Sequence, residues 1–308
     1  MLVWGGGAVV MAVDLYFAGT QCKEAEEIIE SNGYCRLYSY LNDKKNLADR
    51  FSRNPKGKLI VDSGAFTAWT KGTELNVDEY IDWLNTHKDY IYLAGQVDSI
   101  PGKPRQKATK QEVEEAAEKT YNNYWYMREK LDNPDMLLYT FHVGEPFKYL
   151  KKVLEHPGIK YIALGGMVGT NTETKEKFSQ RCFEIIKQSK NPGVKVHAFG
   201  VTTPSILEKF PFASGDSTGW IMTGASGMIY SQYGHLDFSQ NSRNTSKSVF
   251  NLPKEAYEVV LQEVTKLGYT MEQLEESYKA RMCFNIQYLN ELSQKIECKE
   301  FRAKKRLF

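Results

Sequence analysis

Short apolar runs alternate with longer amphipathic segments along most of this chain. Eight runs rich in β-branched or aromatic residues predict strands, and they cover residues 14–18, 35–40, 58–62, 90–98, 137–142, 160–165, 195–200 and 212–217. Between them, apolar positions recur with helical spacing over residues 22–32, 77–87, 110–131, 145–155, 172–189 and 204–210. Strands that alternate with helices in this way indicate βαβ units and a parallel sheet.

Eight strands of this kind fit a (β/α)₈ TIM barrel, whose usual length is about 250 residues. The strand at 212–217 is the least clearly marked, because it is short and contains glycine. An open, doubly wound sheet is the structural alternative. Two more helical patterns follow at 254–266 and 271–297. We therefore expect an α/β TIM barrel with extra C-terminal helices, in one domain (1–308) with the barrel over about 12–250 and a helical appendage over about 251–308.

Composition places the chain among soluble globular proteins. Of its 308 residues 42% are hydrophobic and 25% charged, and no apolar run approaches the roughly 18–20 residues that span a bilayer. The apolar start lacks a basic segment, so it is a poor signal peptide. We expect a cytoplasmic protein without a membrane partner. The five cysteines show no Cys-x-x-Cys spacing, which favours buried free thiols over disulfides or a cysteine-rich zinc site.

Charge is distributed unevenly. The net charge of +2 does not by itself indicate a nucleic-acid partner. Lys103, Arg105 and Lys107 cluster in one predicted loop, however, and a second basic run closes the chain at 299–306. Either could contact phosphates. A solvated loop and a solvated tail explain each feature equally well when it is taken alone.

Polar residues collect where the predicted strands end, and catalytic residues of TIM barrels lie at those ends. Asp62, Asp98 and Asp216 follow the third, fourth and eighth strands. The other residues at these ends that we assign to substrate binding are Ser63, Gly64, Phe66, His142, Gly165, Gly166, Met167, His197, Phe199 and Gly200. Each has a structural explanation when taken alone: an Asx-turn, a hydrogen-bonded core histidine or a core aromatic. Their concentration at one rim favours an active site.

Several of these segments resemble motifs of the tRNA-guanine transglycosylases, in the same order along the chain. They lie at 61–66, 97–98, 163–167, 199–204 and 215–216. The resemblance spans roughly residues 58–220, and its specificity rests on the order of short motifs. It implies a TIM barrel that exchanges guanine for a 7-deazaguanine.

The resemblance also implies how the chemistry is divided. Asp216 matches the nucleophile that attacks the anomeric carbon of the ribosyl group, and Asp62 matches the aspartate that carries protons to and from the exchanging base. Displacing guanine develops oxocarbenium character at the sugar, which a carboxylate can stabilise and then trap as an ester. No metal is needed for either step, and we expect no cofactor.

The remaining matches concern the base. Asp98 matches the carboxylate that reads its amino-pyrimidinone edge, and Phe66 and Phe199 fall where the family sandwiches it. Gly166 and Met167 match backbone contacts to the base. His142 lies near a family glutamine that also reads the base, a looser match than the others.

The departures from the family pattern point to DNA. The tRNA enzymes carry a Cys-x-Cys-x-x-Cys…His zinc site after the last barrel strands, whereas this chain runs into a polar loop at 241–246. No additional RNA-binding domain is visible. The sequence is more similar here to the phage-type DNA transglycosylases, which insert 7-deazaguanines such as 7-cyano-7-deazaguanine, and the Asp-Ser-Thr-x-Trp wording around Asp216 favours the same branch.

Our expectation is therefore a base-exchanging glycosyltransferase that acts on a flipped-out or single-stranded guanine of DNA through a covalent aspartyl–deoxyribose intermediate. If the chain is phage-encoded, it acts in the host cytoplasm. Three alternatives stay open: a tRNA substrate, a non-catalytic nucleic-acid-binding relative, and an unrelated TIM-barrel hydrolase acting on a small glycoside. The sequence leaves the oligomeric state open, with a homodimer among the options.

Overall fold

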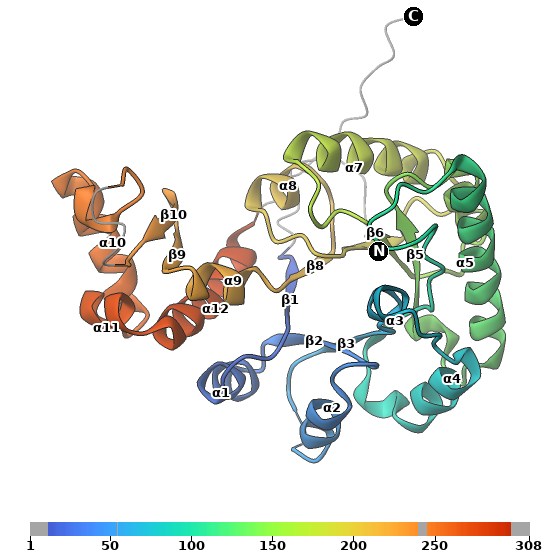
Figure 1. Ribbon diagram of the computed structural model, residues 1–308, viewed down its shortest axis with the longest axis horizontal. Helices are drawn as coiled ribbons and strands as arrows, with labels where there is room; N and C mark the ends of the chain where they lie inside the picture. Colours follow the sequence, from blue (N-terminus) through green and yellow to red (C-terminus); the bar gives the residue numbers. More distant parts are fainter. Residues whose placement is uncertain (1–11, 54, 240–244, 297–308) are drawn as a thin grey trace, which may run out of the picture.

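The closed barrel predicted from the sequence is confirmed. The computed structural model describes residues 12–53, 55–239 and 245–296, and eight parallel strands close a barrel in sequence order (Figure 1). They are β1 (Asp14–Ala18), β2 (Cys35–Ser39), β3 (Leu59–Asp62), β4 (Leu93–Gly95), β5 (Leu137–His142), β6 (Tyr161–Gly165), β7 (Lys195–Ala198) and β8 (Ser214–Ser217). The short β8 pairs with both β7 and β1 and so closes the ring.

The helices between the strands cover the barrel from outside (Figure 1). They are α1 (Lys23–Asn32), α2 (Lys44–Phe51), α3 (Ala65–Lys71), α4 (Val77–Thr86), α5 (Lys110–Lys130), α6 (Phe147–Leu154), α7 (Thr172–Lys187), α8 (Pro204–Lys209) and α9 (Gly219–Ala225). The sequence pattern did not predict α2, α3 or α9, which follow β2, β3 and β8 and have seven or eight residues each. The predicted strand 90–98 is reduced to β4, because Lys88–Tyr90 forms a 3₁₀ turn ahead of it.

Strand alternation decides which side chains face the barrel interior. In β1, Tyr16 and Ala18 belong to the inner cluster of side chains, whereas Leu15 packs outward against the helices. The same period of two places Asp62 on the face of Ile60 in β3, and Ser214 on the face of Asp216 in β8. Polar residues at alternate positions near the strand ends therefore meet inside the mouth of the barrel.

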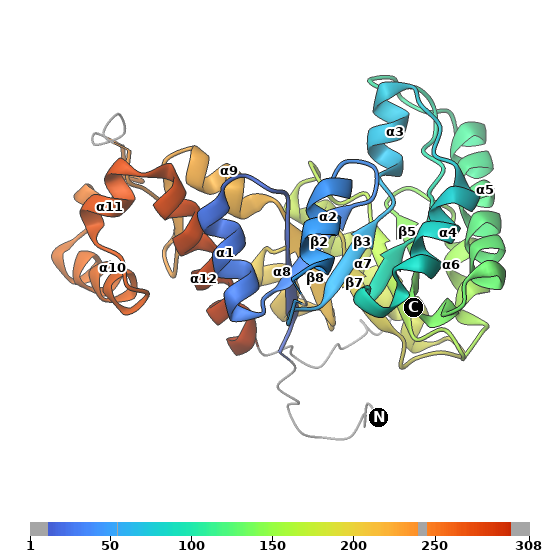
Figure 2. The ribbon, with the colours of Figure 1, turned by 90° about the horizontal axis from the view of Figure 1, so that it is seen from below.

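A C-terminal lobe lies beside the barrel (Figures 1 and 2). It contains the antiparallel hairpin of β9 (Met228–Ser231) and β10 (Gly234–Asp237), together with α10 (Lys254–Lys266) and α11 (Met271–Glu276). Its own core includes Ile229, Phe238, Val260 and Phe284. The lobe thus begins at Met228, ahead of the boundary at 251 that the sequence pattern suggested, since Ile229 and Leu236 of the hairpin pack in the same core as the helices.

The long helix predicted over 271–297 is two helices. Ser277 ends α11, and its hydroxyl accepts a hydrogen bond from the backbone N–H of Ala280, which caps the start of α12 (Tyr278–Lys295). Helix α12 packs against α9, α1 and β1. It therefore covers the barrel as well as joining it to the lobe.

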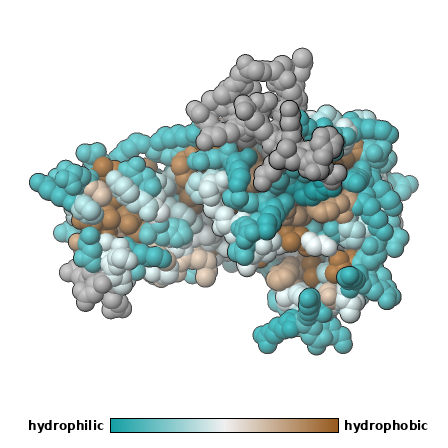
Figure 3. Space-filling model, turned by 90° about the horizontal axis from the view of Figure 1, so that it is seen from above, coloured by the Kyte–Doolittle hydropathy of each residue, from teal (hydrophilic) through white to brown (hydrophobic). Residues whose placement is uncertain are grey.

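Hydrophilic and apolar groups alternate over the face shown in Figure 3, on the lobe as well as the barrel.

Cys182 and Cys283 are buried free thiols as predicted, but Cys22 and Cys35 are partly exposed, and Cys298 lies outside the described residues. Burial raises the pKa of Cys283 to about 12, so this thiol stays protonated. None of the described helices is long and apolar enough to cross a membrane.

Candidate active site at the C-terminal end of the barrel

Asp216 contacts β7 and the turn that follows this strand. Its Oδ1 accepts a hydrogen bond of 2.9 Å from the backbone N–H of Gly200 and lies 3.2 Å from Nε2 of His197. Gly200 has a φ of +68°, a left-handed conformation that glycine adopts without strain. This turn after β7 aims its N–H at the carboxylate. The Asp216 side chain is only 9% exposed, and a buried polar group needs hydrogen-bond partners such as these.

His197 is enclosed in the barrel interior. Its side chain is 0% exposed, and Nδ1 lies 2.7 Å from the hydroxyl of Ser214, which lies 2.8 Å from the hydroxyl of Tyr161. The rings of Tyr16 and Phe199 pack edge-on against the imidazole, with centroid distances of 5.9 Å and 4.6 Å. Packing and hydrogen bonds together fix the imidazole ring.

Asp62 lies at the end of β3 with one oxygen in a turn. Its Oδ2 accepts a hydrogen bond of 2.9 Å from the N–H of Gly64, and the Ser63 hydroxyl accepts from Ala65 at 3.3 Å. Gly64 has a φ of +84° and starts α3. The Asx-turn that explains Asp62 structurally is therefore present, yet it engages one carboxylate oxygen only.

The surroundings of Asp62 tune its protonation. Removal from water raises the pKa of Asp62, and the charges of Asp98 and Asp216 raise it further, against the opposing effects of the Gly64 N–H and His142. The resulting pKa is about 7. A group that titrates near neutral pH can both donate and accept a proton, which is the requirement for general acid–base catalysis.

Asp98 and His142 form an ion pair beside Asp62. Nε2 of His142 lies 3.2 Å from Oδ2 of Asp98, and its Nδ1 lies 2.9 Å from Oε1 of Glu145. Gln96 donates to Oδ1 of Asp98 at 3.1 Å. Burial alone would lower the pKa of His142, but the two carboxylates outweigh burial and hold that pKa well above its usual value. The imidazole is thus a cation at neutral pH.

The diglycine after β6 brings backbone into the mouth. A Cβ at Gly165 would lie 2.7 Å from the His142 ring, so the strand can pass the imidazole only as glycine. Gly166 is exposed with a φ of +70°, and the side chain of Met167 is fully buried. Because the whole Met167 residue is buried, the backbone contact that the sequence resemblance implies for it stays a prediction.

The two predicted stacking aromatics have different surroundings. A Cβ at Gly95 would lie 3.6 Å from Oδ1 of Asp62 and 3.8 Å from the Phe199 ring, which places this ring beside Asp62 in the mouth. Phe66 is 65% exposed, and its ring packs against Trp69 in α3 with a centroid distance of 5.7 Å. Phe199 is therefore positioned as one wall of the site, whereas Phe66 stands on the outer rim.

The basic loop lies on the same rim. Lys103, Arg105 and Lys107 are exposed in the connection between β4 and α5. The indole N–H of Trp69 donates to the carbonyl of Gly102 at 3.0 Å, which fastens this loop to α3. Figure 2 shows α3 and α9, which follow β3 and β8, on one side of the barrel. The other basic run, 299–306, lies outside the described residues. So do residues 241–244 of the polar loop at 241–246.

Sequence reasoning missed four residues that organise this site: Gln96, Glu145, Tyr161 and Ser214. Three of them carried a signal. Gln96 and Ser214 stand two positions before Asp98 and Asp216, and Glu145 follows His142 by three residues across a glycine turn. Tyr161 carried none, because its partner Ser214 lies 53 positions away and only the tertiary structure brings the two together.

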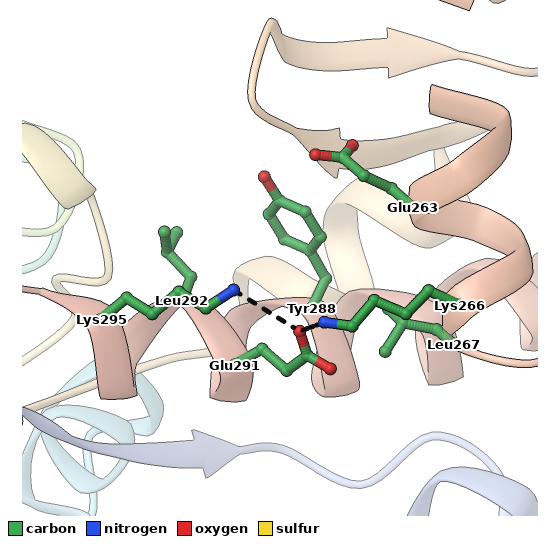
Figure 4. Close-up of a pocket in the computed structure, with 7 residues that line it drawn as sticks. All are labelled: Glu263, Lys266, Leu267, Tyr288, Glu291, Leu292 and Lys295. Atoms are coloured by element: carbon green, nitrogen blue, oxygen red, sulfur yellow. Dashed lines mark hydrogen bonds and ion pairs between the residues drawn. The ribbon is translucent and has the colours of Figure 1, made fainter. Parts of the chain in front are cut away.

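Two cavities lie away from the mouth. One, of about 110 Å³, lies between α10 and α12 and is lined by Glu263, Lys266, Leu267, Tyr288, Glu291, Leu292 and Lys295 (Figure 4). Lys266 and Lys295 both pair with Glu291. The other, of about 760 Å³, opens at the opposite end of the barrel, where Leu93, Tyr161 and Lys195 begin their strands. Neither is lined by Asp62 or Asp216.

Comparisons with known proteins do not assign this chain to a family. A search of protein-family models finds none that matches this chain, and a search of curated proteins finds no match either. Within the described residues, no group of three or more His, Cys, Asp or Glu side chains is arranged to hold a metal ion. The roles assigned to the site residues therefore stay predictions that rest on sequence resemblance and geometry.

Proposed function

We propose that this protein is a DNA-guanine transglycosylase, which replaces guanine by a 7-deazaguanine through a covalent Asp216–deoxyribose intermediate. The observation that carries the proposal is the pairing of two carboxylates with different surroundings in one barrel mouth. One oxygen of Asp216 accepts a hydrogen bond from the N–H of Gly200 and lies 3.2 Å from Nε2 of His197. Asp62 has a pKa of about 7 and is close enough to Asp216 for that charge to contribute to it.

This pairing suits base exchange. The carboxylate of Asp216 attacks the anomeric carbon as the bond to guanine breaks, and protonated Asp62 supplies the hydrogen that the departing base requires. Asp62 is then a carboxylate and can remove a proton from the incoming base. One acid–base group thus serves both halves, because the reaction is nearly symmetric.

The walls of the mouth suit a purine-like base. Phe199 offers an apolar ring face, Gly166 offers exposed backbone, and Asp98 offers carboxylate lone pairs to the N–H groups of an amino-pyrimidinone edge. Asp98 and Glu145 both raise the pKa of His142, and Nε2 of this cation lies 3.2 Å from Oδ2 of Asp98.

The rim supports a polymeric substrate. The three most exposed large apolar side chains among the described residues are Val168 (75%), Met222 (67%) and Phe66 (65%), and all three follow the C-terminal ends of barrel strands. With the basic loop fastened beside α3, the rim combines cations for phosphates with apolar groups for unstacked bases. A guanine within a duplex must leave the stack to reach Asp216.

The decisive experiment measures exchange of radiolabelled guanine and incorporation of 7-cyano-7-deazaguanine. Single-stranded DNA, duplex DNA and tRNA are compared with the wild type and Asp216→Asn. We expect exchange with DNA, and a protein–DNA adduct that survives denaturation in the wild type only. The asparagine is nearly isosteric, so loss of the adduct reflects loss of the nucleophile.

The other outcomes identify the alternatives. Exchange into tRNA alone would move the substrate to tRNA, and base release without exchange would indicate a hydrolase. Binding of nucleic acid without either reaction would indicate a non-catalytic module. Normal exchange by Asp216→Asn would overturn the nucleophile assignment.

A further inference from the structure

A chain of hydrogen bonds crosses the barrel interior and ends at Asp216. It runs from the Tyr161 hydroxyl to the Ser214 hydroxyl (2.8 Å), to Nδ1 of His197 (2.7 Å), and from Nε2 to Oδ1 of Asp216 (3.2 Å). All four residues are buried, with exposures of 6% for Tyr161, 0% for Ser214 and His197, and 7% for Asp216. Their strands, β6, β7 and β8, are neighbours in the barrel.

The chemistry of the groups fixes the direction of this chain. An ionised carboxylate only accepts hydrogen bonds, so Nε2 of His197 carries a hydrogen. If Tyr161 donates to Ser214 and Ser214 donates to Nδ1, every hydrogen in the chain has an acceptor. The reverse direction leaves the Tyr161 hydrogen without an acceptor inside the chain, which is costly for a buried hydroxyl. The geometry therefore favours a neutral imidazole with its hydrogen on Nε2.

The two oxygens of Asp216 are consequently not equivalent. Oδ1 receives the N–H of Gly200 and faces Nε2 of His197. Among the residues that the structure describes, no donor reaches Oδ2. We propose, on the premise of the transglycosylase function, that His197 is a positioning residue which, oriented by Ser214 and Tyr161, fixes Asp216 through Oδ1 and leaves Oδ2 as the attacking oxygen.

The covalent step balances with these assignments. The bond from C1′ to Oδ2 forms as the bond from C1′ to the guanine nitrogen breaks; the electron pair leaves with the base, which takes the proton of Asp62. In the second half the ring nitrogen of the incoming base attacks C1′ and passes its proton to Asp62, and the electron pair of the ester bond returns to Asp216. Donors on Oδ1 stabilise that returning charge. His197 therefore keeps the ester easy to break.

The tautomer is tested directly on the intact protein by nitrogen-15 NMR of labelled histidine. The chain has five histidines, and the His197 signals are assigned by their loss in His197→Gln. At pH 8 we expect Nε2 protonated and Nδ1 unprotonated, and a changed Nδ1 signal in Ser214→Ala. A hydrogen on Nδ1 at pH 8 would overturn the proposed direction of the chain.

The role in the reaction is tested by a graded series of variants assayed for exchange and for trapped adduct. His197→Phe removes the donor, and we expect exchange to fall on the order of 10²-fold while the share of enzyme held as adduct rises. His197→Gln retains an amide donor and should recover most of the exchange rate. Ser214→Ala should cost about tenfold, the effect of one hydrogen bond, and Tyr161→Phe less.

The matched control is Ser179→Ala, which deletes a buried hydroxyl of α7 that has no partner in the described structure. It should leave exchange unchanged. Equal exchange by His197→Phe and wild type would overturn the positioning role, and Ser214→Ala decides the question if His197→Phe does not fold. If the wild type forms no adduct with any nucleic acid, the proposed function is overturned, and the role of Oδ2 with it. The tautomer measurement does not depend on that function and still determines the direction of the hydrogen-bond chain.

Discussion

The two sides of the barrel mouth each pair an aspartate with a histidine, but they hold these groups in opposite ways. On the β7–β8 side His197 is fully enclosed, and it anchors Asp216 together with a backbone donor. On the β3–β5 side His142 is paired with Asp98, is 22% exposed, and is charged by the carboxylates of Asp98 and Glu145. This pair lies beside Asp62, the proton carrier. A nucleophile must not move during attack, whereas a proton carrier must change charge. The difference between the sides matches those two requirements.

The largest effect is expected from breaking the proton-carrying side. Adduct formation by the wild type requires protonated Asp62, so its rate should fall about tenfold per pH unit above pH 7, in line with the pKa of about 7 for this carboxyl. In Asp62→Asn the rate of adduct formation should drop by about 10²–10⁴-fold, and it should no longer fall as the pH rises above 7. Single-turnover adduct formation from pH 6 to 9 measures both. A wild-type rate independent of pH would assign the proton transfer to another group.

The same variant should make the protein more stable at alkaline pH. The folded pKa of Asp62 is raised, so the folded state binds more protons than the unfolded state between the ordinary carboxyl pKa and about 7, and stability is lost as pH rises through that window. Asp62→Asn removes this loss. We expect about 1–3 kcal/mol of added stability at pH 8 and almost none at pH 4, measured by urea unfolding.

A matched control for this measurement is Asp132→Asn, which neutralises a surface carboxylate that is 54% exposed and paired with Lys88. Its effect should be small at both pH values. If Asp62→Asn proves less stable than the wild type at pH 8, Asp62 is favourably paired as a carboxylate, and the raised pKa is wrong.

A smaller effect should follow from weakening the charge on His142. In the wild type each carboxylate oxygen of Glu145 accepts one hydrogen bond from His142. Glu145→Gln keeps one acceptor oxygen and so one of these two bonds, and it removes one of the two carboxylates that raise the His142 pKa. Asp98 then loses part of its counter-charge. We expect KM for the 7-deazaguanine to rise by about three- to tenfold with kcat nearly unchanged, the pattern of lost uniform binding. A fall in kcat at constant KM would instead place Glu145 in the chemical step.

The smallest effect concerns the rim outside both pairs. Replacing Lys103, Arg105 and Lys107 by glutamine should reduce the slope of log K against log salt for DNA by about 2–3, since each phosphate contact releases nearly one counterion. Exchange at saturating DNA should persist, because neither aspartate is touched. The salt titration is the measurement. An unchanged slope would show that DNA does not follow this loop.

The control for the rim replaces three exposed helix lysines, Lys23, Lys177 and Lys254, by glutamine. It removes the same charge from other surfaces. A reduction of the slope equal to that of the rim variant would mean that binding depends on overall charge and not on the loop.

Much of the architecture was predictable from local patterns. Eight apolar runs separated by amphipathic segments specify the strands, since a strand buried on both faces needs a continuous run of apolar residues. Two turns carry little periodicity, and of the five barrel helices with six to eight residues the pattern predicted α6 and α8 but missed α2, α3 and α9. The break at Ser277 was missed because both helices around it continue the same apolar pattern, and only the cap reveals it.

For the site, the sequence determined which residues stand at strand ends and so which side chains share the mouth. It did not determine what they touch. The Tyr161–Ser214–His197 chain joins three strands that meet only when the barrel closes, and the pKa of Asp62 depends on charges 36 and 154 positions away at Asp98 and Asp216. Hydrogen-bond direction and burial act over a few ångströms in space, whereas sequence motifs record neighbours along the chain. The identities of the two aspartates thus come from the sequence, and their different surroundings from the tertiary structure.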